Sequence, residues 1–171
     1  MSKETVGTGQ IGPDEWEVLR RLKLESLDQE PIAFEDAAEG REKYLGRSEA
    51  EWRERLNPER NDRVLLFAKD PSTGEYVGTV SAVIVDGVAT VQHVYVDSAQ
   101  RGKGVGKGLL QDLIAQLKAR EDVKTVVLQV LETQTAAIGL YHSLGFVDTK
   151  LTPNGAKRGD RFYNEIEMTL S

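Results

Sequence analysis

The feature that most constrains this chain is a run of alternating glycines at the point where an extended segment changes into a helical one. Residues 88–96 have the apolar alternation of a strand, whereas residues 104–118 repeat apolar side chains on one helical face. The turn between them contains, in order, Arg101, Gly102, Lys103, Gly104, Val105, Gly106, Lys107 and Gly108. A helix N-terminus carries unbonded amides and about half a unit of positive charge, so it attracts phosphate, and glycine lets the anion approach the backbone. The pattern predicts a phosphate ligand held mainly by main-chain amides, with the three cations adding charge.

Two common phosphate-binding motifs do not fit this turn. The Walker loop, G-x-x-x-x-G-K-S/T, requires serine or threonine where this chain has Gly108, and its first glycine falls on Arg101. The dinucleotide fingerprint, G-x-G-x-x-G, fails because its third glycine falls on Lys107 or Leu109. The remaining pattern, R-G-x-G-x-G, fits either a phosphate ligand or a glycine-rich strand exit that binds nothing.

The first sixty residues read as helix, loop, helix. Pro13 opens an amphipathic helix whose apolar side chains recur at helical spacing until Pro31 ends the pattern. After an acidic connector, Ser48 and Glu51 form a predicted capping box for a second helix, which Pro58 ends.

From residue 63 onward the apolar period becomes extended. The 125–131 segment is apolar nearly throughout and follows a crossover helix, so it should be a buried strand parallel to the 88–96 strand. The expected elements are strands at 63–69, 76–85 and 88–96 in an antiparallel meander, a helix over 104–118, the strand at 125–131, a helix around 136–144, and strands at 146–150 and 161–170 separated by a polar loop. We therefore predict one α/β domain, residues 1–171, with a mixed and largely antiparallel sheet.

Composition restricts the ligands and the compartment. The chain has no cysteine, and its two histidines lack paired spacing, so we expect no disulfide and no metal. It shows neither an apolar membrane span nor a signal-peptide pattern, so we expect a cytoplasmic protein that does not bind membranes. A net charge of −6 argues against nucleic acid as a partner. The acidic excess lies in the first sixty residues, which favours a cationic substrate if that half borders a cleft and otherwise marks solvated helix faces.

The glycine turn and a second segment downstream resemble the two cofactor motifs of the GCN5-related N-acetyltransferases. The segment VYVDSAQRGKGVGKGLL, residues 94–110, is similar to the family's pyrophosphate-binding motif, R/Q-x-x-G-x-G/A. The segment LQVLETQTAAIGLYHSLGF, residues 128–146, is similar to its pattern V-x-x-x-N-x-x-A-x-x-L-Y-x-x-x-G-F. The resemblance is strong over residues 90–147 and loose elsewhere. Gln134 stands where the family has asparagine, which puts that polar contact to the pantetheine in doubt.

The resemblance implies an acyl-CoA N-acyltransferase-like fold of three layers, α/β/α, with the sheet splayed at the cofactor site. It implies acetyl-CoA as co-substrate, with the pantetheine in the gap between the splayed strands and the diphosphate on the glycine turn. A strand amide would then polarise the thioester carbonyl. The implied cofactor-binding residues are Val94, Tyr95, Val96, Arg101, Gly102, Lys103, Gly104, Val105, Gly106, Lys107, Gln134 and Tyr141.

Tyr141 and His93 are the predicted catalytic residues. Tyr141 occupies the family's usual position for the proton donor to the leaving thiolate, with a plain core aromatic as the alternative. Direct attack requires a neutral amine, and an ammonium with a pKa near 10.4 costs about 4.6 kcal/mol to deprotonate at pH 7. His93, which alternation places on the same face as Tyr95, could accept that proton, and so could Glu165, Glu35 or a chain of waters.

Three functions remain open at this point. The first is an N-acetyltransferase that moves acetyl from acetyl-CoA to a primary amine by direct attack in a ternary complex. The second is a non-catalytic acyl-CoA sensor or interaction module with the same fold, and the third is a phosphate-binding domain unrelated to acyl transfer. No motif in the sequence identifies the amine, and the resemblance suggests a homodimer formed through edge strands.

Overall fold

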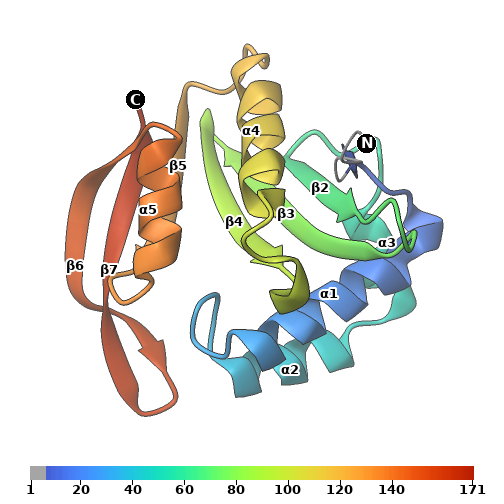
Figure 1. Ribbon diagram of the computed structural model, residues 1–171, viewed down its shortest axis with the longest axis horizontal. Coiled ribbons are helices and arrows are strands. Elements are labelled where there is room, and N and C mark those ends of the chain that lie inside the picture. The colour runs from blue at the N-terminus through green and yellow to red at the C-terminus, as the bar shows by residue number, and fades with distance from the viewer. Residues whose placement is uncertain (1–6) are drawn as a thin grey trace.

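The computed structural model describes residues 7–171 and contains one seven-stranded sheet with helices on both faces (Figure 1). The strands are β1 (Gly7–Gly9), β2 (Arg63–Lys69), β3 (Tyr76–Val85), β4 (Val88–Val96), β5 (Thr125–Leu131), β6 (Phe146–Arg158) and β7 (Arg161–Leu170). Their order is β1-β2-β3-β4-β5-β7-β6, and within the described residues β4 with β5 is the one parallel pair. The mixed, largely antiparallel sheet predicted from the sequence is confirmed.

Two apolar clusters lie on opposite faces of this sheet. The helices are α1 (Trp16–Gln29), α2 (Ala37–Gly46), α3 (Glu49–Arg55), α4 (Val105–Lys118) and α5 (Thr135–Ser143). One cluster joins the sheet to α4 and α5 and includes Leu113 and Phe146. The other joins it to α1, α2 and α3 and includes Leu22 and Trp52, both fully buried. The protein therefore has three layers, α/β/α, and β4 contributes side chains to both clusters.

The first and third helices begin where their local sequence directs. A short 3-10 turn, Pro13–Glu15, precedes α1, and the buried stripe of α1 contains Leu19, Leu22, Ser26 and Leu27. In α3 the predicted capping box is present, because the Ser48 hydroxyl accepts from the Glu51 amide while the Glu51 carboxylate accepts from the Ser48 amide.

The segment expected to be an acidic connector contains a further helix, α2. Its N-cap is Asp36, whose carboxylate accepts a hydrogen bond from the Glu39 amide at 3.0 Å. Gly40 and Tyr44 are its buried residues, so the helix carries almost no apolar periodicity for a sequence pattern to detect. The reading of the first sixty residues as helix, loop, helix was therefore wrong here.

The polar stretch expected as a loop at residues 151–160 is mostly strand. β6 continues to Arg158 and turns back into β7 at Gly159 and Asp160. It is the edge strand of the sheet, and its side chains are exposed at nearly every position, so it shows no alternation. Backbone pairing to β7, with register shifts at residues 148–150 and 152–156, maintains the strand where side-chain burial does not. The short strand β1 was likewise not predicted.

Candidate active site

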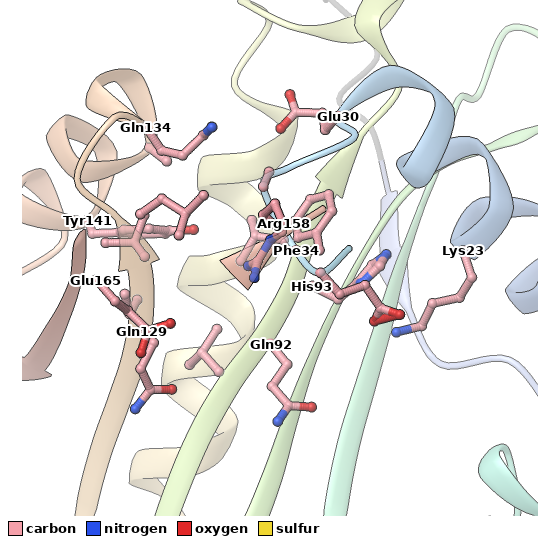
Figure 2. Close-up of a pocket in the computed structure, with 18 of the residues that line it drawn as sticks. Lys23, Glu30, Phe34, Gln92, His93, Gln129, Gln134, Tyr141, Arg158 and Glu165 are labelled. Atoms are coloured by element: carbon pink, nitrogen blue, oxygen red, sulfur yellow. The ribbon is translucent and has the colours of Figure 1, made fainter. Parts of the chain in front are cut away.

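The parallel strands β4 and β5 separate at their C-terminal ends. Their pairing ends at Val91 and Leu128, yet β4 continues to Val96 and β5 to Leu131 (Figure 1). A cavity of about 450 Å³ lies in this gap. Its walls come from β4, β5, α5 and the loop between α1 and α2 (Figure 2). The splayed sheet implied by the family resemblance is thus present, and an extended ligand can enter between the strands.

A β-bulge interrupts β4 beside this cavity. The register between β3 and β4 shifts between Thr79 and Ser81, where two residues of β4, His93 and Val94, oppose one residue of β3. His93 has a φ of 56°, a left-handed conformation that is uncommon outside glycine. Its side chain and that of Tyr95 face α1, whereas Val94 packs on the α4 cluster, as the alternation predicted. Bulges re-aim the backbone beside functional sites.

The glycine turn leads directly into α4, and its conformation depends on glycine. Gly102 has a φ of 76° and Gly104, the N-cap of α4, a φ of 81°. The space beside Gly102, Gly104 and Gly108 is open for 4 Å where a β-carbon would stand. No side chain among residues 7–171 caps the helix, so the first amides, up to that of Lys107, remain available to a ligand. The turn therefore presents free amides and open space where the sequence predicts an anion site.

The cations of this turn are not equivalent. The Arg101 guanidinium donates to the Val96 carbonyl at 3.1 Å and pairs with the Glu30 carboxylate at 3.0 Å. Lys103 reaches the Gln100 side chain at 3.4 Å, and Lys107 is exposed. Because Glu30 also lines the cavity, Arg101 joins the turn to the cavity wall.

Tyr141 lies on α5 and reaches the opposite wall of the cavity, as does Gln134 at the N-terminus of that helix (Figure 2). Its side chain is buried, and its ring packs edge-on against Phe146. Burial, and secondarily the charge of Glu30, raises the pKa of Tyr141 to about 12. Its hydroxyl makes no hydrogen bond with any residue from 7 to 171 and stays protonated at neutral pH, so it can donate to a ligand in the cavity.

His93 is held in one orientation and in one tautomer by α1. The Ser26 hydroxyl donates to the Lys23 carbonyl at 2.7 Å, so its oxygen must accept from His93 Nε2, 2.8 Å away. The His93 ring stacks on Phe34 with centroids 4.4 Å apart. Burial, followed by the charges of Lys23 and Lys43, lowers the pKa of His93 well below its ordinary value. His93 is therefore neutral at pH 7, with Nδ1 as its unprotonated nitrogen.

Lys23 is a cavity residue that the sequence analysis missed. Figure 2 shows its side chain directed toward β4 beside His93. Burial lowers the pKa of Lys23 to about 7 and outweighs the opposing charge of Glu35. Within residues 7–171 its ammonium group makes no hydrogen bond or ion pair. A signal was present, because Lys23 lies four residues after Leu19, inside the apolar stripe of α1.

The two carboxylates proposed as alternative proton acceptors differ in their surroundings. Both oxygens of Glu35 are occupied, one by Lys43 at 2.9 Å and the other by the Tyr44 hydroxyl at 2.9 Å. Glu165 lines the cavity from β7, and its carboxylate makes no hydrogen bond with the other described residues. Glu165 is therefore the freer of the two to meet a substrate.

The β6–β7 hairpin closes one side of the cavity. Arg158 lines the cavity and donates from Nε to the Ile32 carbonyl at 2.7 Å. The Gly159 amide donates to the Asp36 carboxylate, the same group that caps α2. These bonds from backbone amides lower the pKa of Asp36. The β6–β7 hairpin and the α1–α2 loop thus form one wall of the cavity together.

The fold and the cleft together define a class of protein: an α/β domain with a splayed parallel strand pair, an uncapped helix N-terminus after a glycine turn, and a tyrosine in the gap. The sequence matches the acetyltransferase (GNAT) family over residues 24–146, and the chain belongs to that family. No helix in the described part of the chain is long and apolar enough to cross a membrane. Residues 7–171 contain no group of three or more side chains suited to hold a metal.

Characterised relatives match about half of the chain. The L-methionine sulfoximine/L-methionine sulfone acetyltransferase of Salmonella typhimurium is 48% identical over 83 residues, covering 47% of this chain and 46% of the relative. The ribosomal protein bS18-alanine N-acetyltransferase of Escherichia coli is 35% identical over 91 residues, covering 53% and 60%. The chain thus spans about half of the length of the curated relatives it matches.

Solved structures share the complete fold. The acetyltransferase of GNAT family from Streptococcus pneumoniae superposes with a TM-score of 0.82 at 19% identity, covering 96% of this chain and 98% of that one. The ribosomal-protein-S18-alanine N-acetyltransferase from Escherichia coli gives 0.70 at 21% identity, covering 97% and 93%. An Arabidopsis thaliana protein solved in complex with acetyl-CoA gives 0.71 at 18% identity, covering 96% and 97%.

Proposed function

We propose that the protein is an N-acetyltransferase that transfers acetyl from acetyl-CoA to an amine. The observation that carries this proposal is the gap between β4 and β5, which opens onto a cavity holding the Tyr141 hydroxyl and adjoins the glycine turn through Glu30 and Arg101. Family membership and a neighbour of the same fold in complex with acetyl-CoA support the choice of donor.

The chain offers a place for each part of acetyl-CoA. The diphosphate would accept from the amides of the turn, residues 102–107, and the pantetheine would lie beside the backbone of residues 94–96 with Gln134 across the gap. Arg101 would contribute chiefly by fixing the turn, because its guanidinium is already bound to Val96 and Glu30. The bulge at His93 and Val94 would aim a strand amide at the thioester carbonyl.

Tyr141 would assist departure of the thiolate. A thiol has a pKa of about 8.5, so complete transfer of a proton from a hydroxyl of pKa about 12 would cost about 4.8 kcal/mol. A hydrogen bond that strengthens as charge develops on the sulfur avoids most of that cost. We therefore assign Tyr141 as the hydrogen-bond donor to the leaving sulfur.

The proton of the attacking amine would pass to a group on the α1 side of the cavity. His93 is neutral but a weak base, because its pKa is well below the ordinary value. Lys23, with a pKa of about 7, is more basic and is largely neutral above that pH. Glu165 and water remain alternatives. A rise of kcat/KM with pH near 7 that disappears in Lys23→Met would identify Lys23, and persistence of the rise would return the role to the other candidates.

Acetyl-CoA turnover against a panel of amines, followed by release of free thiol, tests the proposed activity. The panel should include amino-acid derivatives and peptide N-termini, because the named relatives act on methionine sulfoximine and on the alanine of a ribosomal protein. Turnover with at least one amine would support the enzyme. Tight binding of acetyl-CoA without turnover of any amine would favour the alternative, a non-catalytic acyl-CoA sensor.

Location and assembly stay predictions. We propose a cytoplasmic protein, which fractionation of expressing cells would test.

The exposed edge strand β6, with Val147 and Leu151 about half exposed, is the surface on which a homodimer would form. Sedimentation of the purified chain would measure that assembly.

A further inference from the structure

A second, smaller cavity lies away from the acetyl-transfer cleft. It has a volume of about 80 Å³ and lies between the C-terminal end of α3 and the start of β2. Three arginines line it: Arg55, Arg60 and Arg63. It shares no lining residue with the larger cavity, so it is a distinct site.

Two of these three guanidinium groups have no partner among the described residues. Arg60 binds Asp62 through two hydrogen bonds of 2.9 and 2.6 Å, whereas the side chains of Arg55 and Arg63 make no hydrogen bond or ion pair with any residue from 7 to 171. The Nε atom of Arg63 is buried and unbonded. An unpaired charge removed from water is costly, and proteins normally pair or ligate such groups.

A further arginine adds to the same surplus of positive charge. Arg47 lies over the rings of Tyr44 and Trp52, 5.1 and 4.8 Å from their centroids, and one of its terminal nitrogens is buried without a partner among the described residues. Burial, followed by the charges of Arg47 and Arg63, lowers the pKa of Arg55 to about 10. The guanidinium groups therefore destabilise one another.

The carboxylates nearby do not neutralise this cluster. Asp62 is already bound by Arg60. Glu54 acts on Arg63 from a distance, forms no ion pair among the described residues, and accepts from Asn57 at 3.4 Å. The positive charge of the arginines in and around the small cavity thus exceeds the negative charge of the neighbouring carboxylates.

We propose that Arg55 and Arg63 bind a phosphate group in this second cavity, with the charge of Arg47 nearby adding to theirs. Several converging guanidinium groups match the charge of a phosphate dianion, whereas a single carboxylate would leave most of their charge uncompensated. The volume, about 80 Å³, is large enough for one small oxyanion and far smaller than the 450 Å³ of the larger cavity. The group is either free phosphate or the end of a phosphomonoester whose remainder projects into solvent.

Calorimetry tests this site. The protein is first loaded with coenzyme A and desalted, so that the glycine turn is already occupied when phosphate is added. Inorganic phosphate, O-phosphoserine and acetate are titrated at constant ionic strength into the wild type, Arg55→Gln, Arg63→Gln and the exposed control Arg161→Gln. We expect one saturable phosphate per chain in wild type and control, no heat with acetate, and affinity about tenfold or more weaker in both cluster variants. Binding of O-phosphoserine as tight as phosphate would identify a phosphomonoester, and binding of phosphate alone the free ion.

Stability supplies a second readout that does not depend on the ligand. Removing one charge from the cluster relieves repulsion, so without phosphate Arg63→Gln should denature at the same temperature as the wild type or higher, and phosphate should raise only the wild-type and control midpoints. Equal phosphate binding by all four proteins, or none by the wild type, would overturn the proposal. Variants that lose stability equally with and without phosphate would mark the arginines as structural and would also overturn it.

Discussion

The two faces of the sheet bury their side chains in different ways. The α4 and α5 face is apolar and carries the glycine turn, whose ligand groups belong to the backbone. The α1 to α3 face contains charged groups that are wholly or partly buried, among them Lys23, Arg47, Arg55 and Glu35. Under the proposed function, a backbone site would serve the one constant ligand, acetyl-CoA, and charged side chains on the other face would select the acceptor. The predictions below test this division, from the largest expected effect to the smallest.

Tyr141→Phe should remove most of the transfer activity and leave acetyl-CoA binding intact. The hydroxyl makes no hydrogen bond within residues 7–171, so its loss should not lower stability. A positioned proton or hydrogen-bond donor contributes roughly a hundredfold to ten-thousandfold to rate. Thiol release should fall by at least about a hundredfold. Tyr163→Phe, on β7, is the matched control and should retain activity; equal rates in the two variants would exclude the assigned role of Tyr141.

Lys23→Met should flatten the pH dependence of stability. The pKa of Lys23 is lowered from 10.5 to about 7, so between these values the unfolded state binds the extra proton and stability rises with pH. The slope from one proton is at most about 1.4 kcal/mol per pH unit, and it vanishes below pH 7, where both states are protonated. Urea denaturation from pH 7 to 9 measures this slope. We expect Met at position 23 to raise stability at pH 7, and an unchanged slope would contradict the burial of this charge.

Gly104→Ala should weaken coenzyme A binding and destabilise the fold. Its φ of 81° places any β-carbon in a strained left-handed conformation that costs roughly 1–2 kcal/mol. Gly108→Ala is the control, because Gly108 lies within α4 with open space around it and should gain about 0.5–1 kcal/mol. Thermal denaturation and calorimetry with coenzyme A separate the two effects. Equal behaviour of both variants would mean that the turn does not depend on the left-handed residue.

Glu30→Gln should have the smallest effect. It removes the ion pair between Glu30 and Arg101, two side chains that are both partly exposed. Such a pair stabilises a folded protein by about 0–1 kcal/mol. It also removes the negative charge that helps to raise the pKa of Tyr141. We expect nearly unchanged stability, together with a small downward displacement of the Tyr141 pKa in an ultraviolet titration referenced to Tyr141→Phe. A large loss of stability would show that the turn needs this tie to fold.

Sequence alone predicted the elements of the α4 and α5 face well, because the information for them is local. The spacing of the glycines and the positions of Tyr141 and Gln134 follow from motifs, and the antiparallel meander follows from alternation and turns. These features require no knowledge of what the opposite face contains. The parallel pair also followed from chain order, because a crossover helix joins β4 to β5.

The α1 to α3 face and the β6–β7 hairpin were poorly predicted because their features arise only in the folded chain. Lys23 lies in an apolar stripe, but its depressed pKa comes from burial in the folded protein and, to a smaller extent, from the charges of Arg55 and Arg47. α2 buries too little to show a periodicity, and β6 is stabilised by backbone pairing at an exposed edge. The tautomer of His93 depends on Ser26, 67 residues away along the chain. No local window contains such information.

The wall made by the β6–β7 hairpin has a consequence for how the site is assembled. Arg158 contacts Ile32 across 126 positions of sequence, and Gly159 contacts Asp36 across 123. Contacts of such long range form after local ones, because the intervening chain must first be ordered. A nascent chain that has emerged only as far as α5 already contains both nucleotide motifs but lacks the wall that completes the acceptor pocket. Synthesis of residues 144–171 should therefore add the wall that encloses this side of the cavity.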